Sequence, residues 1–257
     1  MRAVIVHHHP GLGDHLICNG LVHTILDRED FVYLAARRRY LPTVQCLYSE
    51  EPRVEVFPVD DETDDVEAFA RRMKLPVIRI GFEHCDKRRF DESFYEQMGV
   101  PFEDRYRRSR LPRYIPDEDR LFESVAPAGD YVVTHRENSL GLFNLRIESD
   151  LPRVDIRTGM DRSNNLLACR RLIMHAREIH CVNSSVLHLV DCLDPPGARY
   201  YHAVRRTDFK LRPCWTVVPY ATNPLLAVIR RGVARGRLIG LRALEQLAPP
   251  ARQPWST

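Results

Sequence analysis

The sequence lacks the features that mark several large classes of protein. It has no long apolar run: the longest stretch without a formal charge, residues 213–229, contains prolines and several polar residues and does not predict a membrane-spanning helix. No signal peptide is indicated, because the first apolar run, residues 3–6, is short and three histidines follow it. These two absences predict a cytoplasmic protein without a transmembrane segment.

The sequence also lacks closely spaced cysteine pairs and a large excess of charge of one sign. The 7 cysteines include no Cys-x-x-Cys pair, so neither a disulfide framework nor a thiolate zinc site is indicated. Lys and Arg number 38 against 35 Asp and Glu, and the resulting net charge of +3 is too small to indicate a nucleic-acid partner. What is present is an ordinary globular composition, 44% hydrophobic over 257 residues, which is enough for one or two domains with a real core.

Short β-type runs alternate with helical patterns along most of the chain, which is typical of parallel sheets with right-handed crossovers. Strands are predicted first at residues 2–6, 31–34, 54–59 and 77–80, with helices at 16–26, 41–48 and 64–73. After an Arg- and Pro-rich stretch at residues 104–116, strands are predicted at 131–135, 154–156, 178–182, 199–203 and 216–218, with helices at 166–176, 185–193 and 224–247.

The sequence therefore predicts an α/β protein with two Rossmann-like domains that face a cleft. The stretch at residues 104–116 is interpreted as the linker. The N-terminal domain is assigned to residues 1–112, and the C-terminal domain to residues 113–257 with a terminal helix that packs back. Because ligands of such sheets bind at the carboxyl ends of the strands, the turns after strands are the candidate site.

The turn after the first strand contains Gly11 and Gly13, which allow a sharp bend and a close ligand approach. Amides at the start of the next helix favour an anion. Asp14 has two interpretations: it caps the helix, or it is a general base that takes a proton from an acceptor hydroxyl. Capping hydrogen bonds would lower its basicity. His15 is the second candidate for the base.

Three consecutive histidines, residues 7–9, precede this turn. Since consecutive residues of a strand point to opposite faces, the three are not expected to bind one metal ion. We expect one of them to line the cleft, and place His8 on the acceptor side. Glu83, which follows the strand at residues 77–80, is placed there too, with an ordinary turn as the alternative.

A second turn of interest contains Asn183, Ser184 and Ser185 between a buried strand and a helix that carries His188. Hydroxyl groups and unpaired amides at a helix N-terminus suit a diphosphate. Ser184, Ser185 and His188 can share one helix face, since they lie three and four residues apart. The alternative is a capped helix with a structural histidine.

Further donor-binding candidates follow other strands of the second domain. Arg136 can offer a bidentate pair to a phosphate, and Ser139 a hydroxyl. Arg205 follows a predicted strand and is placed close enough to reach the donor. The alternative for Arg136 is a solvated surface arginine.

The two turns together resemble bacterial heptosyltransferases and their relatives, which are glycosyltransferases of the GT-B fold. The first strand, followed by Gly13-Asp14 and an apolar helix, is similar to their N-terminal motif, whose Asp is thought to be the catalytic base; it matches Asp14. The chain is short for that fold, so the resemblance implies a compact version. The His-rich start also resembles small uncharacterised proteins of viral and bacterial type.

Their second motif, Asp-Thr-Gly-x-x-His-Leu at the nucleotide-sugar phosphates, has the spacing of Asn183-Ser-Ser-Val-Leu-His188-Leu189. His188 is retained, and Asn183 replaces the Asp and removes a charge near the nucleotide. The Asn-Ser-Ser run is also similar to the nucleotide-sugar loop of some fucosyltransferases.

The resemblance implies a glycosyltransferase that moves a sugar from a nucleotide-sugar donor to a glycan or another hydroxyl acceptor, lipid-linked or protein-linked. It implies a direct, inverting reaction in which a helix dipole and basic side chains stabilise the leaving group, with no cofactor and no metal. Two alternatives remain: an inactive protein that binds a nucleotide or a sugar phosphate, and a two-domain enzyme of the nucleotide-sugar epimerase type.

Overall fold

The structure is a computed structural model that describes residues 2–83, 85–86, 88–157, 159–204 and 209–220. The described chain up to Pro219 belongs to one compact unit. Arg205 and the helix predicted at residues 224–247 lie outside the described residues.

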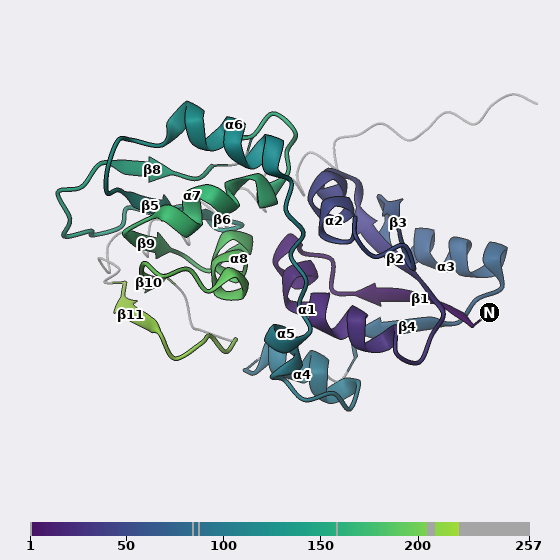
Figure 1. The fold of residues 1–257 in the computed structure, drawn as a ribbon. Coiled ribbons are helices and arrows are strands. Elements are labelled where there is room, and N and C mark those ends of the chain that lie inside the picture. Colours follow the sequence, from purple (N-terminus) through teal and green to yellow (C-terminus); the bar gives the residue numbers. More distant parts are fainter. Residues whose placement is uncertain (1, 84, 87, 158, 205–208, 221–257) are drawn as a thin grey trace, which may run out of the picture. The chain divides into compact units, whose positions relative to one another are not determined.

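The first sheet has four parallel strands in the order β3-β2-β1-β4, as in half of a dinucleotide-binding fold (Figure 1). Its central strand is buried on both faces, with Ile5 and Val6 inaccessible. The strands are β1 (Ala3–His8), β2 (Phe31–Arg37), β3 (Val54–Val59) and β4 (Val77–Ile80), and the helices between them are α1 (Leu12–Ile25), α2 (Leu41–Leu47) and α3 (Glu62–Met73).

The second sheet has five parallel strands in the order β11-β10-β9-β5-β8. A short antiparallel hairpin, β6 (Glu137–Asn138) and β7 (Gly141–Leu142), follows β5. The strands of the sheet are β5 (Val132–His135), β8 (Arg153–Asp155), β9 (Glu178–Cys181), β10 (Ala198–Ala203) and β11 (Trp215–Pro219), and its helices are α6 (Ile115–Val125), α7 (Arg170–His175) and α8 (Ser185–Leu193). The predicted α/β fold with two parallel sheets is confirmed.

Residues 104–116, the predicted linker, connect the strands of the first sheet to those of the second, but the stretch is partly helical. This stretch contains the short helix α5 (Asp104–Arg107) and the start of α6, and another unpredicted helix, α4 (Phe90–Gln97), lies before it. Pro116 stands in the first turn of α6, where its missing N–H costs no hydrogen bond, so this proline begins a helix instead of marking a loop.

Helix α1 is the centre of the main core. From Asp14 onward nearly all its residues are buried, and it packs against α8 of the second sheet and against α5. Gly20 of α1 meets the backbone of Asp104 and Arg105 so closely that a Cβ there would collide with the Asp104 carbonyl. Figure 1 shows α1 and α8 between the two groups of strands. The turns that precede these two helices are the ones that sequence analysis singled out.

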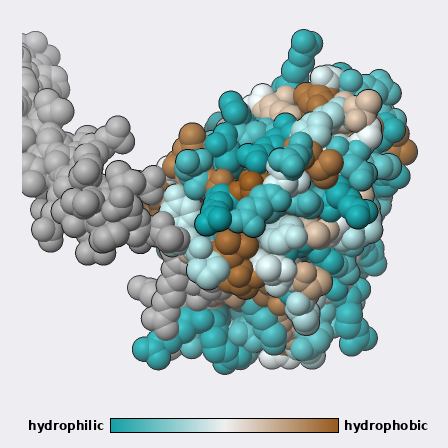
Figure 2. All heavy atoms as spheres, turned by 90° about the vertical axis from the view of Figure 1, so that its left-hand side faces the viewer, coloured by the Kyte–Doolittle hydropathy of each residue, from teal (hydrophilic) through white to brown (hydrophobic). Residues whose placement is uncertain are grey.

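The face in Figure 2 is mostly hydrophilic, with apolar residues in separate patches. Exposed large apolar side chains in the second half include Leu140 and Leu142 of the hairpin and Val217 of β11. Among the described residues, no helix is long and apolar enough to cross a lipid bilayer.

Candidate functional site

The first turn of the site joins β1 to α1 by way of Pro10 and Gly11. Gly11 is the N-cap of α1, and the Asp14 carboxylate accepts a hydrogen bond from the Gly11 N–H at 3.0 Å. A Cβ on Gly11 would lie 2.5 Å from Asp14 Oδ2, so only glycine allows this contact. The interpretation of Asp14 as the N-cap is therefore wrong, because the N-cap is Gly11. Asp14 lies three residues later, in the first turn of α1, where the helix dipole stabilises a carboxylate.

Asp14 has a second partner on the same oxygen. His9 Nδ1 lies 2.8 Å from Asp14 Oδ2. Because a carboxylate can only accept, the His9 Nδ1 atom carries the proton of this hydrogen bond. The His9 side chain is 44% exposed and that of Asp14 is 13% exposed, so the imidazole covers the carboxylate.

His8 and His15 lie behind this turn and do not line the pocket described below. His8 is 1% exposed and His15 is inaccessible, and their rings meet edge to face with centroids 4.3 Å apart. Burial lowers the pKa of both imidazoles, that of His15 to well below its ordinary value. Both are therefore neutral at pH 7. The strand was predicted to end at Val6, but β1 continues to His8 by pairing with β4, which puts His9 in the turn instead.

The second turn joins β9 to α8. Ser184 is the N-cap of α8, and its hydroxyl accepts from the Leu187 N–H at 3.4 Å and donates to the Val182 carbonyl. This confirms the prediction that Asn183 or Ser184 caps the helix. The carbonyl of Asn183 accepts from Asn138 Nδ2 at 3.1 Å, which ties the turn to the β6–β7 hairpin.

His188 connects the two turns. A Cβ on Gly13 would lie 2.9 Å from His188 Cδ2, so the imidazole edge rests on the glycine of the first turn. His188 Nδ1 lies 3.2 Å from Arg105 Nη2. A guanidinium can only donate, so Nδ1 accepts and a neutral His188 carries its proton on Nε2.

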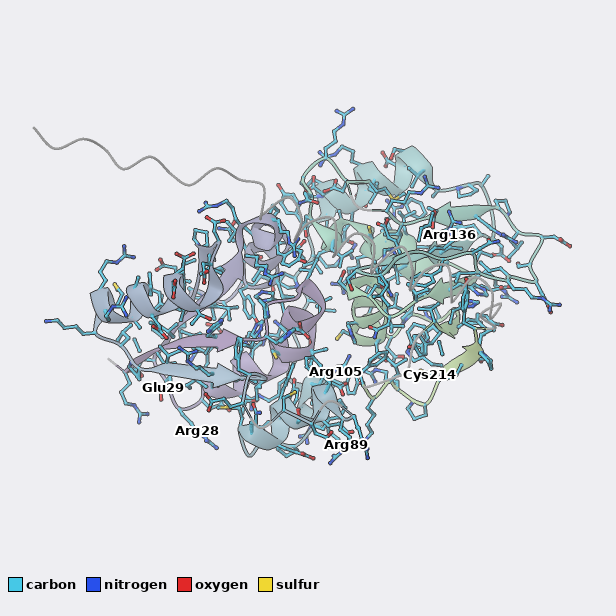
Figure 3. The ribbon with its side chains drawn as sticks, turned by 180° about the vertical axis from the view of Figure 1, so that it is seen from behind. Arg28, Glu29, Arg89, Arg105, Arg136 and Cys214 are labelled. Carbon is cyan, nitrogen blue, oxygen red and sulfur yellow. The ribbon has the colours of Figure 1, made fainter. Side chains whose placement is uncertain are left out.

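Arg105 is a fully buried cation at the junction of the two sheets, where Figure 3 labels it. Its guanidinium lies 2.6 Å from Asp91 of α4 and 3.2 Å from Asp191 of α8, and it donates to the Lys210 carbonyl. The burial of Arg105 was not predicted from the sequence, where its stretch was assigned to a linker. No pattern within the stretch marks one arginine for burial, because its partners come from distant segments.

The two carboxylates around Arg105 have further donors. Asp191 accepts from the Tyr106 hydroxyl, the Trp215 indole N–H and the Arg212 backbone N–H, and Asp91 accepts from the Lys210 backbone N–H. Burial nevertheless raises the pKa of Asp91 to about 6, against the opposing effect of Arg105. Pairing of Arg105 with the two carboxylates therefore allows these charged groups to be buried away from water.

A third wall of the site comes from the segment after β5. Ser139 lies in the hairpin loop and lines the pocket, whereas Arg136 does not. The guanidinium of Arg136 makes a bidentate pair with Asp155, with Nη2 2.7 Å from Oδ2. Burial by itself raises the pKa of Asp155, but hydrogen bonds from Arg136, Thr134 and Arg157 lower it below its ordinary value. Figure 3 shows Arg136 among the strands of the second sheet.

The far end of the site is closed by contacts between α2 and the segment before α7. Thr43 Oγ1 donates to the Asn164 carbonyl at 3.4 Å and accepts from the Leu166 N–H at 2.9 Å. Asn164 Nδ2 donates to the Arg39 carbonyl. None of these residues was predicted for the site, because the hydrogen bonds join segments more than 100 residues apart in the chain.

These walls enclose a pocket of about 850 Å³ at the carboxyl ends of β1, β5 and β9. It brings together eight of the predicted site residues: Gly11, Gly13, Asp14, Ser139, Asn183, Ser184, Ser185 and His188. It does not include His8, His15, Glu83 or Arg136. Glu83 lies in an exposed turn, where its carbonyl accepts from Gln97, and Arg205 lies outside the described residues.

No metal centre is indicated by the described part of the chain, which contains no group of three or more His, Cys, Asp or Glu side chains placed to hold an ion. The cations that line the pocket include Arg39 and Arg157, and Arg157 also pairs with Asp155.

No protein-family model and no curated protein matches the sequence. Solved structures do match. E. coli ADP-heptose LPS heptosyltransferase II superposes with a TM-score of 0.52 at 12% identity, over 87% of this chain and 92% of that enzyme. The iron-containing dodecameric glycosyltransferase TibC of enterotoxigenic E. coli does so with 0.54 at 13%, over 86% of this chain and 65% of TibC. A family 9 glycosyltransferase of Veillonella parvula gives 0.52 at 8%, over 84% and 85%.

The chain has a GT-B fold. The likeness is one of architecture, with two parallel α/β sheets in this chain. In this chain the pocket is lined from the first sheet by the Asp14 turn and from the second by the Ser184 turn.

Proposed function

We propose that the protein is a glycosyltransferase that uses a nucleotide-sugar donor. The observation that carries the proposal is the meeting of both turns in one pocket, with a carboxylate and an imidazole on one side and a capped helix N-terminus on the other. The GT-B architecture supports it, and the heptosyltransferase TibC, which shares that architecture, has been solved in complex with ADP-D-β-D-heptose.

On this proposal the donor diphosphate lies at the start of α8. The backbone N–H groups of Ser185 and Val186 open that helix and have no intrahelical partner, and the helix dipole favours negative charge there. His188 reaches the same region with its Nε2–H edge, which is set by Arg105. A diphosphate that departs from a sugar gains negative charge, and donors fixed in advance stabilise that charge without reorganisation.

The acceptor lies at the Asp14 turn. A hydroxyl there loses its proton as its oxygen attacks the anomeric carbon, so the reaction is a single displacement with inversion. The basic group belongs to the turn at residues 9–14, which lines the same pocket as the start of α8. The residues that hold the donor and those that activate the acceptor thus come from different sheets.

The proposal is tested by the thermal stability of the purified chain against a panel of nucleoside diphosphates and nucleotide sugars, with and without magnesium. A ligand at ~100 times its Kd adds about 2.7 kcal/mol to the free energy of unfolding. A rise with one nucleotide, and release of its diphosphate from the sugar, is the expected result. Asp14→Asn should keep the rise and lose the release.

Ser184→Ala probes the donor side separately. It removes the cap of α8 and is expected to cost about 1 kcal/mol of stability and to weaken the nucleotide-induced rise. Ser124→Ala, an exposed hydroxyl on α6, is the control and should leave the rise unchanged. Panels that produce no rise with any nucleotide would contradict the proposed function.

One observation favours a second function, binding of a nucleotide or sugar phosphate without transfer. Asp155 pairs with both Arg136 and Arg157, which reduces the positive charge offered to a diphosphate. On this alternative a nucleotide stabilises the chain but no nucleotide sugar is cleaved.

A further inference from the structure

We propose that His9 is the general base of this site and that Asp14 is the residue that orients it. The inference rests on the proposed function and assigns the proton transfer within it. It departs from the sequence-based expectation, in which the Asp14 carboxylate itself takes the proton.

The hydrogen bond between the two residues sets the tautomer of His9. His9 Nδ1 lies 2.8 Å from Asp14 Oδ2 and must donate to it. A neutral His9 therefore carries its only proton on Nδ1, and its basic nitrogen is Nε2, at the opposite side of the ring. A buried or half-buried carboxylate that fixes an imidazole in this way also stabilises the imidazolium that forms when Nε2 takes a proton.

The position of the two side chains favours the imidazole over the carboxylate. Both line the pocket, but the His9 side chain is 44% exposed and the Asp14 side chain only 13%. Asp14 Oδ2 already accepts two hydrogen bonds, from His9 and from the Gly11 N–H. An acceptor hydroxyl that enters the pocket thus meets the ring of His9 before it meets this oxygen.

The surroundings of His9 keep its charge under the control of Asp14. Its ring packs edge-on against Phe90 of α4, with centroids 5.2 Å apart, and lies 6.3 Å from Phe82 after β4. The titratable groups that the described residues place beside it include Asp14 on α1 and, at the end of β1, His7 and His8. Burial lowers the pKa of His7 to about 4 and also lowers that of His8, so both are neutral at pH 7. Asp14 is a carboxylate hydrogen-bonded directly to the His9 ring.

The proposed step balances as follows. The acceptor O–H bond breaks and its proton moves to His9 Nε2, while the acceptor oxygen forms a bond to the anomeric carbon. The bond from that carbon to the diphosphate oxygen breaks, and the oxygen keeps the electron pair at the start of α8. His9 leaves the step as imidazolium, paired with the unchanged Asp14 carboxylate, and returns its proton to water.

The first experiment needs no substrate. The side-chain nitrogen resonances of the full chain, labelled with 15N histidine, are followed by NMR against pH, and His9 is assigned by its loss in His9→Gln. In Asp14→Asn the midpoint of the His9 titration should fall by about 1 pH unit or more, because an adjacent carboxylate stabilises the imidazolium. An unchanged midpoint would overturn the orienting role of Asp14.

The second experiment measures release of nucleoside diphosphate from the nucleotide sugar that stabilises the chain, against pH, with water and simple sugars as acceptors. His9→Gln should bind the nucleotide normally and lose about 100-fold or more in rate. Added imidazole should restore part of the loss in His9→Gln and none in the exposed control His175→Gln, which has no loss to restore.

The outcomes separate this inference from the proposed function. If His9→Gln keeps a rate within a few-fold of wild type while Asp14→Asn is inactive, Asp14 is the base and the inference is wrong, although the transferase survives. If no nucleotide sugar is bound or cleaved, the proposed function fails and the proton-transfer role fails with it, whatever the NMR titration shows of the pair.

Discussion

At the scale of single residues, Arg105 is a cation that solvent does not reach. It is inaccessible, and both its carboxylate partners are inaccessible too. Taking charges out of water costs several kcal/mol per ion, and the pairing roughly balances that cost. The benefit is therefore geometric: the cluster aligns α4, α5 and α8 and presents one fixed edge of His188 to the pocket.

Arg105→Met is expected to lower the free energy of unfolding by about 3–5 kcal/mol, because it leaves Asp91 and Asp191 buried without their cation. Urea unfolding followed by circular dichroism measures the loss. Arg89→Met is the matched control: Arg89 pairs with Glu92 and Glu96 in a half-exposed position and should change the midpoint little. Equal effects of the two substitutions would contradict the assigned role of the buried cluster.

The candidate site residues show which features of the site can be predicted from local sequence patterns. The predicted glycines and small hydroxyl residues after strands do line the pocket, because turn chemistry and strand ends are local properties of the sequence. The choice among three histidines failed, since it depends on where β1 stops: pairing with β4 continues to His8 and shifts the exposed position to His9. The buried environment of Arg105 could not be predicted from the local sequence, because its hydrogen-bond partners lie 14 to 105 residues away in the chain.

At the scale of elements, α1 decides how closely the two halves approach. It is buried on nearly every side, and Gly20 brings its backbone against that of α5. The helix propensity lost at a glycine is about 1 kcal/mol, which Gly20→Ala would recover in isolation. The collision of the new Cβ with the Asp104 carbonyl is with backbone, which has no rotamer to move away.

Gly20→Ala is therefore expected to destabilise the protein by about 1–3 kcal/mol despite the better helix former. The urea midpoint should fall while the m-value stays unchanged. Ser124→Ala on the exposed face of α6 is the control and should be neutral or slightly stabilising. A stabilised Gly20→Ala variant would show that α1 and α5 can separate without cost.

Element prediction succeeded where periodicity was strong and failed where it was interrupted. The strands of both sheets are short apolar runs between turn residues, which is a clear signal. Helices α4 to α6 have only 8, 4 and 11 residues and mix aromatic with charged side chains. Their sequences therefore resemble a polar connection, and the helices form because they cover α1 and the second sheet, not because of local preference.

At the scale of the whole molecule, buried histidines predict a stability that falls with acid. Burial lowers the pKa of His7, His23 and His202 to about 4 in the folded state, against an ordinary value of 6.5. Folding therefore excludes the protonated form. Their contribution is complete above pH 6.5 and is lost as the pH falls towards 4. Asp91, with a raised pKa of about 6, acts in the opposite sense.

Between pH 7.5 and 5.5 each of these three histidines is expected to remove about 1.3 kcal/mol and Asp91 to return about 0.8 kcal/mol, so that these four groups together lower the free energy of unfolding by about 3 kcal/mol. Urea unfolding at the two pH values measures it. The same comparison on His7→Gln should show a loss smaller by about 1.3 kcal/mol, even if the variant is less stable at both pH values. Stability that is constant or rising towards pH 5.5 would contradict the assignment.

The buried Arg105, which pairs with carboxylates from both halves, also limits which chimeric proteins can be built from this chain. Exchange of the second half for that of another GT-B protein would pack a new α8 against the original α4 and α5. A chimera whose new α8 lacks a carboxylate at the position of Asp191 would leave the Arg105 guanidinium buried without that partner. The two halves are thus co-adapted, not interchangeable modules. Any graft of a new second half onto this first half therefore has to include Asp191 and also His188, one helical turn earlier, because both contact Arg105.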